Sequence, residues 1–186
     1  LKKNPFVVCS KEELQHTLDS LTAKSAPAFY VHKKEKPNVI IVIWESLTAK
    51  LHQKQHKGVA VIPTIDSLTR SAVWFSNMYA SGDRTEKGLA AILSGYPAQA
   101  LTSIVKETKK ASSLPSPILS FAQRGYNSSF IYGGDLEFAG MGAYVRSMGF
   151  GQILEMDDFP KEQHNSKWGA HDEFIFQKSI ETLKTQ

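Results

Sequence analysis

Glu45 and Thr85 are the two residues of this sequence best placed to do chemistry. Glu45 directly follows residues 39–44, a continuous apolar and largely β-branched run (VIIVIW) that predicts a strand buried on both faces. A carboxylate at the end of such a strand is costly to bury unless it is paired or binds a cation. Glu45 is therefore a candidate metal ligand; the alternatives are a helix cap or an ion pair with a lysine.

Thr85 lies in the segment SGDRTEKG, residues 81–88, between a predicted strand and a predicted helix. Helix N-termini offer free N–H groups and the positive end of the helix dipole, which suit a phosphate or sulfate. A hydroxyl at that place can act as a nucleophile if a cation or a base lowers its pKa. The alternative is a helix N-cap, a common use of threonine.

Asp135 and Glu137 follow a third predicted strand, within the segment YGGDLEF, residues 132–138. The two glycines allow close approach of the backbone, so the segment is either a loop lining a substrate site or a left-handed turn with Asp135 as an N-cap. Asp172 either begins the last helix or faces the same cleft.

His52, His56 and Cys9 offer little as metal ligands. The two histidines are four residues apart, but the residues between them lack the glutamate of a zinc-protease motif, so both are predicted to be solvated. With one cysteine, neither an intrachain disulfide nor a cysteine-based zinc site can form.

The remaining pattern predicts the elements that position these residues. Strands alternate with helices, which predicts an α/β fold with a parallel sheet and helices on both faces. Ligands of such sheets bind beyond the carboxyl ends of the strands, where Glu45, Thr85 and Asp135 occur. The predicted strands are 39–44, 73–79 and 127–132, and the predicted helices are 63–70, 86–93, 117–123, 136–148 and 171–183.

Residues 1–36 differ from the rest of the chain. Ser10 and Glu13 form a capping-box pattern that predicts a helix over 11–24, and 25–36 has the composition of a linker. Residues 37–186 form the second predicted region. The sequence contains neither a signal peptide nor an apolar run of the ~18 residues needed to span a bilayer, and it begins with Leu, so we expect a piece whose targeting segments lie outside it.

The composition is that of a folded domain with a mild positive charge. Of the 186 residues, 41% are hydrophobic and 22% charged, and the net charge is +4. The lysines are dispersed rather than interleaved with aromatics in one patch, which disfavours nucleic-acid binding. A mild positive charge is compatible with an anionic substrate or membrane surface.

Taken together, the motifs resemble the sulfatase-like branch of the alkaline phosphatase superfamily, in particular the lipoteichoic acid synthase-like phosphoglycerol transferases. They occur in family order over residues 37 to about 180. The matching segments are PNVIIVIWES (37–46), PTID (63–66), GDRTEKG (82–88), SGYP (94–97), GY (125–126), YGGDLEF (132–138), MGF (148–150) and WGAHD (168–172).

The resemblance implies an alkaline phosphatase-like sheet with helices on both faces and a divalent cation, Mn²⁺, Mg²⁺ or Zn²⁺. Glu45 matches the family's first metal ligand, and Thr85 its nucleophile and a ligand of the same cation. Attack by Thr85 on a phosphate would give a phosphothreonine, and the group would then pass to a hydroxyl or to water. Arg84 either clamps a phosphate oxygen or faces solvent. Asp135 and Glu137 are candidate substrate-binding residues.

The sequence also departs from that family. The family completes its metal site with an Asp-His pair and a further histidine, and no Asp-His dipeptide occurs here. This implies the N-terminal part of a catalytic domain, partnered by the rest of that domain and inactive alone. Lipoteichoic acid synthases carry a Trp and an Arg in the loop after the third strand, whereas this chain has Phe-Ala-Gly-Met-Gly at 138–142.

The expected partners are an anionic phospholipid donating its headgroup and an acceptor bearing a hydroxyl, with no nucleic acid. The expected location is the extracytoplasmic side of a cell membrane, with residues 11–24 next to the membrane. A phosphodiesterase or phosphoethanolamine transferase of the same superfamily, and a non-catalytic module, are the alternatives. A true sulfatase is disfavoured because no Cys/Ser-x-Pro-x-Arg sequence is present.

Overall fold

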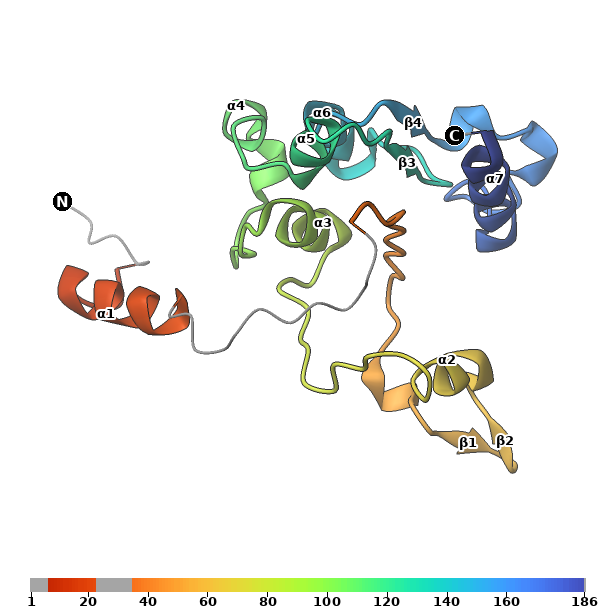
Figure 1. The fold of residues 1–186 in the computed structure, drawn as a ribbon, viewed down its shortest axis with the longest axis horizontal. Helices are drawn as coiled ribbons and strands as arrows, with labels where there is room; N and C mark the ends of the chain where they lie inside the picture. Colours follow the sequence, from red (N-terminus) through yellow and green to blue (C-terminus); the bar gives the residue numbers. More distant parts are fainter. Residues whose placement is uncertain (1–6, 23–34, 186) are drawn as a thin grey trace. The chain divides into compact units, whose positions relative to one another are not determined.

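The computed structural model describes residues 7–22 and 35–185 (Figure 1). The chain divides into two compact units, Leu1–Trp44 and Glu45–Gln186. In the first unit, α1 (Lys11–Thr22) confirms the predicted helix as far as the structure describes it. The Glu13 N–H donates to Ser10 Oγ (3.1 Å) and the Ser10 N–H donates to Glu13 Oε2 (2.8 Å), so the predicted capping box is present. Residues 23–34, which include most of the predicted linker, lie outside the described residues.

Two predicted strands are not formed. Residues 39–44 have no assigned strand, and their side chains are 43% to 66% exposed. Residues 73–79 likewise have none, and Tyr79 is 84% exposed. A strand requires a neighbour that takes its backbone hydrogen bonds, and within the described residues neither segment has one. These two predicted strands, and the burial predicted for 39–44, are therefore wrong for the described residues, because an apolar run does not by itself supply the partner strand that burial needs.

The second unit begins with a small hairpin and a helix. After the 3₁₀ turn Ala49–Leu51, β1 (Gln55–His56) and β2 (Val59–Ala60) pair antiparallel, followed by α2 (Pro63–Leu68). The hairpin loop is Lys57–Gly58, with φ of +50° and +79°. Two consecutive residues with positive φ are typical of a two-residue hairpin turn. Such a turn favours glycine at its second position. The helix confirms the prediction over 63–70.

His52 is not solvated as predicted, although His56 is exposed. The Nδ1 atom of His52 lies 2.8 Å from Asp66 Oδ1, and its ring centroid lies 5.0 Å from that of Trp74. Asp66 also accepts a hydrogen bond from the Gln53 N–H (3.0 Å), which is the main reason that its pKa is lowered; burial opposes this and the His52 contact adds to it. The pairing holds α2 to the preceding turn.

The helices of the rest of the unit follow local sequence signals. Gly95, with φ of +63°, ends α3 in the left-handed conformation, and Pro117 begins α5. The helix predicted over 136–148 is shorter, because Ala139 and Gly140 have φ of +58° and +72° and interrupt it. The helices are α3 (Thr85–Ser94), α4 (Thr108–Ala111), α5 (Pro117–Ala122), α6 (Met141–Ser147) and α7 (Asp172–Thr185), with 3₁₀ turns at Ile104–Lys106, Phe138–Gly140, Met156–Asp158 and Lys161–Gln163.

A parallel strand pair confirms the predicted α/β class. β3 (Ser129–Ile131) pairs in parallel with β4 (Gln152–Leu154), with Phe130 opposite Ile153. The helix α6 lies between them in sequence, so the segment is a strand–helix–strand crossover. β3 confirms the predicted strand at 127–132 in a shorter form, whereas β4 was not predicted. Helix α7 also contacts β3.

The core of the second unit lies between α3, α6 and the segments joining them. Leu136, Tyr144, Val145 and Met148 are at most 1% exposed. Phe130 and Ile153 pack against this cluster from the sheet. The crossover is thereby fixed to α3, the helix that begins at Thr85.

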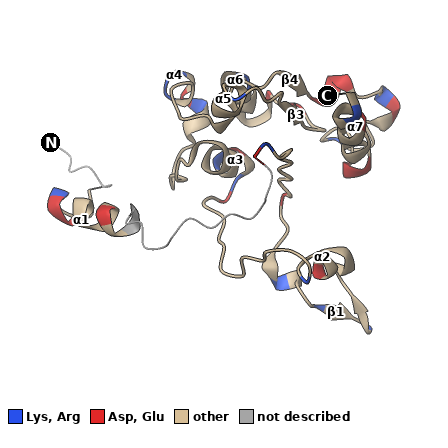
Figure 2. Cartoon of the chain, viewed as in Figure 1, with Lys and Arg blue, Asp and Glu red and all other residues tan. Residues whose placement is uncertain are grey.

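Charged residues are spread over the elements rather than gathered on one of them (Figure 2). Lysines occur on α1, α4 and α7, in line with the dispersed charge of the sequence. No helix among the described residues is both long and apolar enough to cross a bilayer.

Candidate active site

The structure brings Glu45 and Thr85 together across forty positions of sequence. The Thr85 hydroxyl donates to Glu45 Oε1 at 3.0 Å, and both residues are exposed. Ser46 has φ of +60°, so the backbone turns sharply directly after Glu45. The site therefore consists of the Thr85 hydroxyl hydrogen-bonded to the Glu45 carboxylate, with both residues exposed to solvent.

Thr85 is not the cap of its helix. Arg84 occupies the N-cap position with extended backbone, and Thr85 is the first residue of α3. The N-cap alternative for Thr85 is therefore wrong, and its hydroxyl is engaged with Glu45 instead. At this position the oxygen lies at the positive end of the helix dipole, where a developing negative charge is stabilised.

The segment preceding Thr85 is fixed at several points. Lys87 Nζ pairs with Asp83 Oδ1 (2.9 Å), and this hydrogen bond is the main cause that lowers the pKa of Asp83. The Ala98 N–H donates to Ser81 Oγ (3.0 Å). A Cβ on Gly82 would lie 2.8 Å from the Cβ of Lys87, so only glycine fits there without a shift. These contacts hold the backbone that presents Arg84 and Thr85.

Tyr132 belongs to the same neighbourhood, and the sequence did not single it out. Burial raises the pKa of its phenol, and the charges of Glu45 and Asp135 raise it further. Both carboxylates therefore lie close enough to act on the ring. Its place at the end of β3 was the signal that could have identified it.

The segment 133–138 is packed tightly against residues 166–170. Gly133 accepts a hydrogen bond from the Ala170 N–H (2.9 Å), and a Cβ on Gly133 would lie 2.5 Å from the Ala170 carbonyl oxygen. Neither Gly133 nor Gly134 has a positive φ. The left-handed-turn alternative is therefore wrong: the glycines serve close approach, and Asp135 Oδ1 accepts the Glu137 N–H (2.7 Å) rather than capping a helix.

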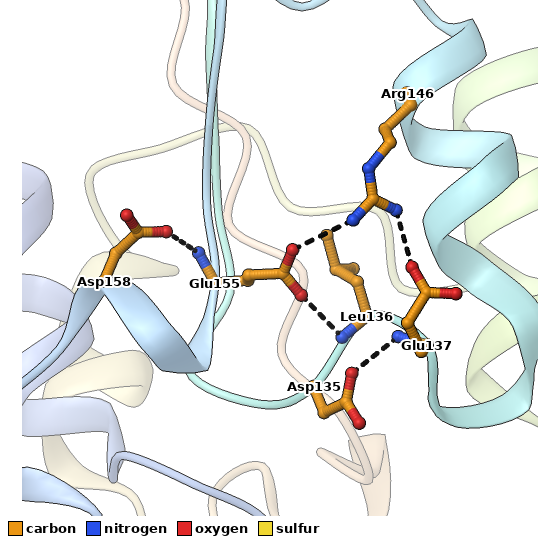
Figure 3. A network of polar contacts seen from close by, with 6 residues as sticks. All are labelled: Asp135, Leu136, Glu137, Arg146, Glu155 and Asp158. Carbon is orange, nitrogen blue, oxygen red and sulfur yellow. Dashed lines mark hydrogen bonds and ion pairs between the residues drawn. The ribbon is translucent and has the colours of Figure 1, made fainter. Parts of the chain in front are cut away.

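Glu137 and Asp135 differ in what their carboxylates contact. Glu137 Oε1 accepts a hydrogen bond from Arg146 Nη1 at 2.8 Å (Figure 3). Asp135 remains exposed near Tyr132, and Arg84 is exposed beside Thr85. Asp172 begins α7 and is exposed, as one of its two readings predicted. The substrate-binding roles of Arg84, Asp135 and Glu137 stay predictions.

Glu45 and Thr85 are also a candidate pair of cation ligands. A carboxylate and a hydroxyl are hard oxygen ligands of the kind that Mg²⁺ and Mn²⁺ prefer. In the part of the chain that the structure describes, no group of three or more His, Cys, Asp or Glu residues could hold a metal ion. The two residues fit such a cation in ligand type but supply only part of its coordination shell.

The family of the chain is shown by a match to the sulfatase family model over residues 37–186. The chain belongs to the sulfatase family. The match covers both Glu45 and Thr85 and confirms the resemblance seen in the sequence. It begins where the second predicted region begins.

Solved structures support the fold of this sulfatase-family chain. A protein of the alkaline phosphatase superfamily from Vibrio parahaemolyticus is 29% identical, with a TM-score of 0.61 over 68% of this chain. The lipoteichoic acid synthase LtaP from Listeria monocytogenes is 14% identical, with a TM-score of 0.66 over 73% of this chain. The predicted alkaline phosphatase-like α/β fold is thereby confirmed.

Curated relatives include phosphoglycerol transferase I of Xanthomonas campestris pv. campestris (strain B100) and of Xanthomonas euvesicatoria pv. vesicatoria (strain 85-10). Each is 30% identical over 66 residues, which is 33% of this chain. The chain covers 9% of those relatives, and 31% and 33% of the two solved chains. It therefore spans less than two thirds of the length of each of these four proteins.

Proposed function

We propose that this chain is part of an enzyme that transfers a phosphoglycerol-type headgroup from an anionic phospholipid to a hydroxyl acceptor, through a phosphothreonine at Thr85. The observation that carries the proposal is the 3.0 Å contact between Thr85 Oγ1 and Glu45 Oε1. The sulfatase-family match and the relatives named phosphoglycerol transferase I support it at the level of phosphoester transfer.

In the first step, the Thr85 oxygen attacks phosphorus, and the bond from phosphorus to the diacylglycerol oxygen breaks. The diacylglycerol leaves with a proton, and the glycerophosphoryl group stays on Thr85. An acceptor hydroxyl then attacks the same phosphorus, its proton is lost, and the Thr85 oxygen leaves and is reprotonated. A bound Mn²⁺, Mg²⁺ or Zn²⁺ would lower the pKa of the attacking hydroxyl and offset negative charge on the phosphoryl oxygens.

The residues of this chain have distinct parts in the proposal. Glu45 orients the Thr85 hydroxyl and, with it, supplies oxygen ligands for the cation. The N-terminus of α3 favours the negative charge that develops on the phosphoryl group. In the proposal, Arg84 contacts a phosphoryl oxygen, and Asp135 contacts the hydroxyls of the headgroup. The proposed location is the extracytoplasmic face of a membrane.

The test uses the full-length protein with Mn²⁺ and vesicles of phosphatidylglycerol labelled in the headgroup. We expect labelled Thr85, detected by mass spectrometry after acid quenching, and none in Thr85→Ala. Thr108→Ala is the matched control, because Thr108 is the exposed first residue of α4. Label transferred at an unchanged rate by Thr85→Ala would exclude Thr85 as the nucleophile. Release of free glycerophosphate without an acceptor product would favour a phosphodiesterase.

A further inference from the structure

Arg146 joins three parts of the second unit through two carboxylates (Figure 3). From α6 its Nη1 donates to Glu137 Oε1 (2.8 Å), and its Nη2 donates to Glu155 Oε1 (3.1 Å). Glu137 lies in the segment after β3, and Glu155 directly follows β4. The guanidinium therefore joins the segment after β3 to the end of β4 through two separate nitrogens.

The second carboxylate, that of Glu155, also binds a backbone N–H group. Glu155 Oε2 accepts the N–H of Leu136 (3.1 Å), a residue with no exposed surface. The Glu155 N–H in turn donates to Asp158 Oδ2 (2.9 Å). Glu155 thus ties the segment after β3 to the end of β4 both directly and through Arg146.

Gly142 leaves the space that the Arg146–Glu137 pair occupies. A Cβ at this position would overlap Arg146 Nη1 and Glu137 Oε1. A glycine in the first turn of a helix costs backbone entropy, so close approach is the benefit that it offers here. With a Cβ at residue 142, the ends of the Arg146 and Glu137 side chains would have to move from these positions.

The segment that Arg146 holds contains Asp135, a candidate substrate-binding residue. The Glu137 N–H donates to Asp135 Oδ1 (2.7 Å), so the residue clamped by Arg146 also orients the Asp135 carboxylate. Tyr132, at the start of this segment, lies within electrostatic reach of both Asp135 and Glu45. A displacement of residues 135–137 would shift Asp135 relative to the Glu45–Thr85 pair.

We propose that Arg146 is a positioning residue, which with Glu137 and Glu155 fixes the segment after β3 so that Asp135 faces the headgroup bound at Thr85. This rests on the proposed function of Thr85. A surface ion pair contributes little to stability, so its value here is geometric. Arginine is required because a lysine ammonium is a single point charge and cannot reproduce two donors on separate nitrogens.

The experiment compares Arg146→Lys, Arg146→Ala and Gly142→Ala in the full-length protein, with vesicles of phosphatidylglycerol labelled in the headgroup and Mn²⁺. We expect kcat/KM to fall about 10- to 100-fold in all three, as for other residues that orient reacting groups. We expect the thermal midpoint of Arg146→Lys to stay within about 2 °C of wild type. Arg124→Ala is the matched control: Arg124 is exposed, and its side chain has no hydrogen bond or ion pair among the described residues.

Hydrogen exchange supplies a readout that does not depend on turnover. In Arg146→Ala the amides of residues 136 and 137 should exchange at least about tenfold faster than in wild type, because local opening becomes easier. Unchanged exchange there, or wild-type kcat/KM in Arg146→Lys, would overturn the proposal. A loss of turnover that only tracks the fraction of unfolded protein would overturn it too, because the role would then be structural. If wild type shows no Thr85-dependent turnover, the proposed function fails, and the exchange rates still decide whether Arg146 holds the segment.

Discussion

At the scale of single residues, the contact between Thr85 and Glu45 gives one carboxylate two tasks. Its Oε1 accepts a hydrogen bond from the Thr85 hydroxyl, and in the proposed function the same carboxylate would also bind the cation. Exchange of Glu45 for an isosteric amide keeps the shape of the side chain but removes its charge. The two tasks therefore predict a combined loss of cation affinity and of turnover.

Glu45→Gln should lower turnover of labelled phosphatidylglycerol by about 10²-fold or more and raise the Mn²⁺ concentration needed for half-maximal rate. The measurement is the rate of headgroup transfer by the full-length protein as Mn²⁺ is titrated. Glu173→Gln, on an exposed glutamate in the first turn of α7, is the control. An unchanged Mn²⁺ dependence in Glu45→Gln would remove Glu45 from the cation site.

The pairing of Asp66 with Gln53 and His52 predicts a pH dependence of stability. The pKa of Asp66 is lowered from 3.8, chiefly by the Gln53 N–H, so the folded state prefers the charged carboxylate. The resulting stabilisation is present above the unfolded pKa and is lost as the pH falls through the lower folded pKa. The urea midpoint should therefore decrease below about pH 4. In Asp66→Asn the urea midpoint should be lower than in wild type near pH 6, and it should fall less steeply as the pH decreases. Equal decreases of the midpoint in the variant and in wild type would contradict this.

At the scale of elements, the sequence predicted the helices better than the strands. Helix ends are set by local signals, such as the capping box at Ser10 and the left-handed Gly95, and these are visible within a few residues. Strands depend on partners elsewhere in the chain. Residues 39–44 have strong strand character but no partner in the described residues, whereas β4 forms from a short, weakly patterned segment.

The same distinction explains the candidate site. Glu45 and Thr85 were predictable because Glu45 directly follows an apolar segment, Thr85 opens a predicted helix, and each matches a family motif. The role of Arg146 was not predictable, because its partners Glu137 and Glu155 lie nine residues before and after it. The strand–helix–strand crossover brings the three residues together. Tyr132 was missed although it follows β3 directly, because the carboxylates after the strand drew the prediction and the influence of Glu45 on the phenol exists only in three dimensions.

Two glycines should respond in opposite ways to alanine. Gly133→Ala places a Cβ 2.5 Å from the Ala170 carbonyl oxygen and 2.6 Å from Ile175 Cδ1, so it should destabilise the second unit by about 1–3 kcal/mol. Gly88→Ala lies within α3 and meets no atom within 4 Å, so it should stabilise by up to about 1 kcal/mol. Urea unfolding of the chain measures both. A neutral Gly133→Ala would show that residues 166–170 do not pack on this segment.

At the scale of the whole molecule, cation affinity depends on how many ligands the chain contributes. The ligands proposed for the cation are Glu45 and Thr85, and among the described residues no group of three or more His, Cys, Asp or Glu residues could hold a metal ion. Hard divalent cations take about six oxygen ligands, and two protein ligands leave most of the shell to water. Residues 1–186 alone should therefore bind Mn²⁺ with a dissociation constant weaker than about 10⁻⁴ M. Isothermal titration calorimetry measures this dissociation constant. The Glu45→Ala variant is expected to lose the weak heat of Mn²⁺ binding that the wild-type chain shows. Tight, stoichiometric binding that survives Glu45→Ala would mean that the cation is held by other residues, and the chemistry assigned to Thr85 would then lack its metal.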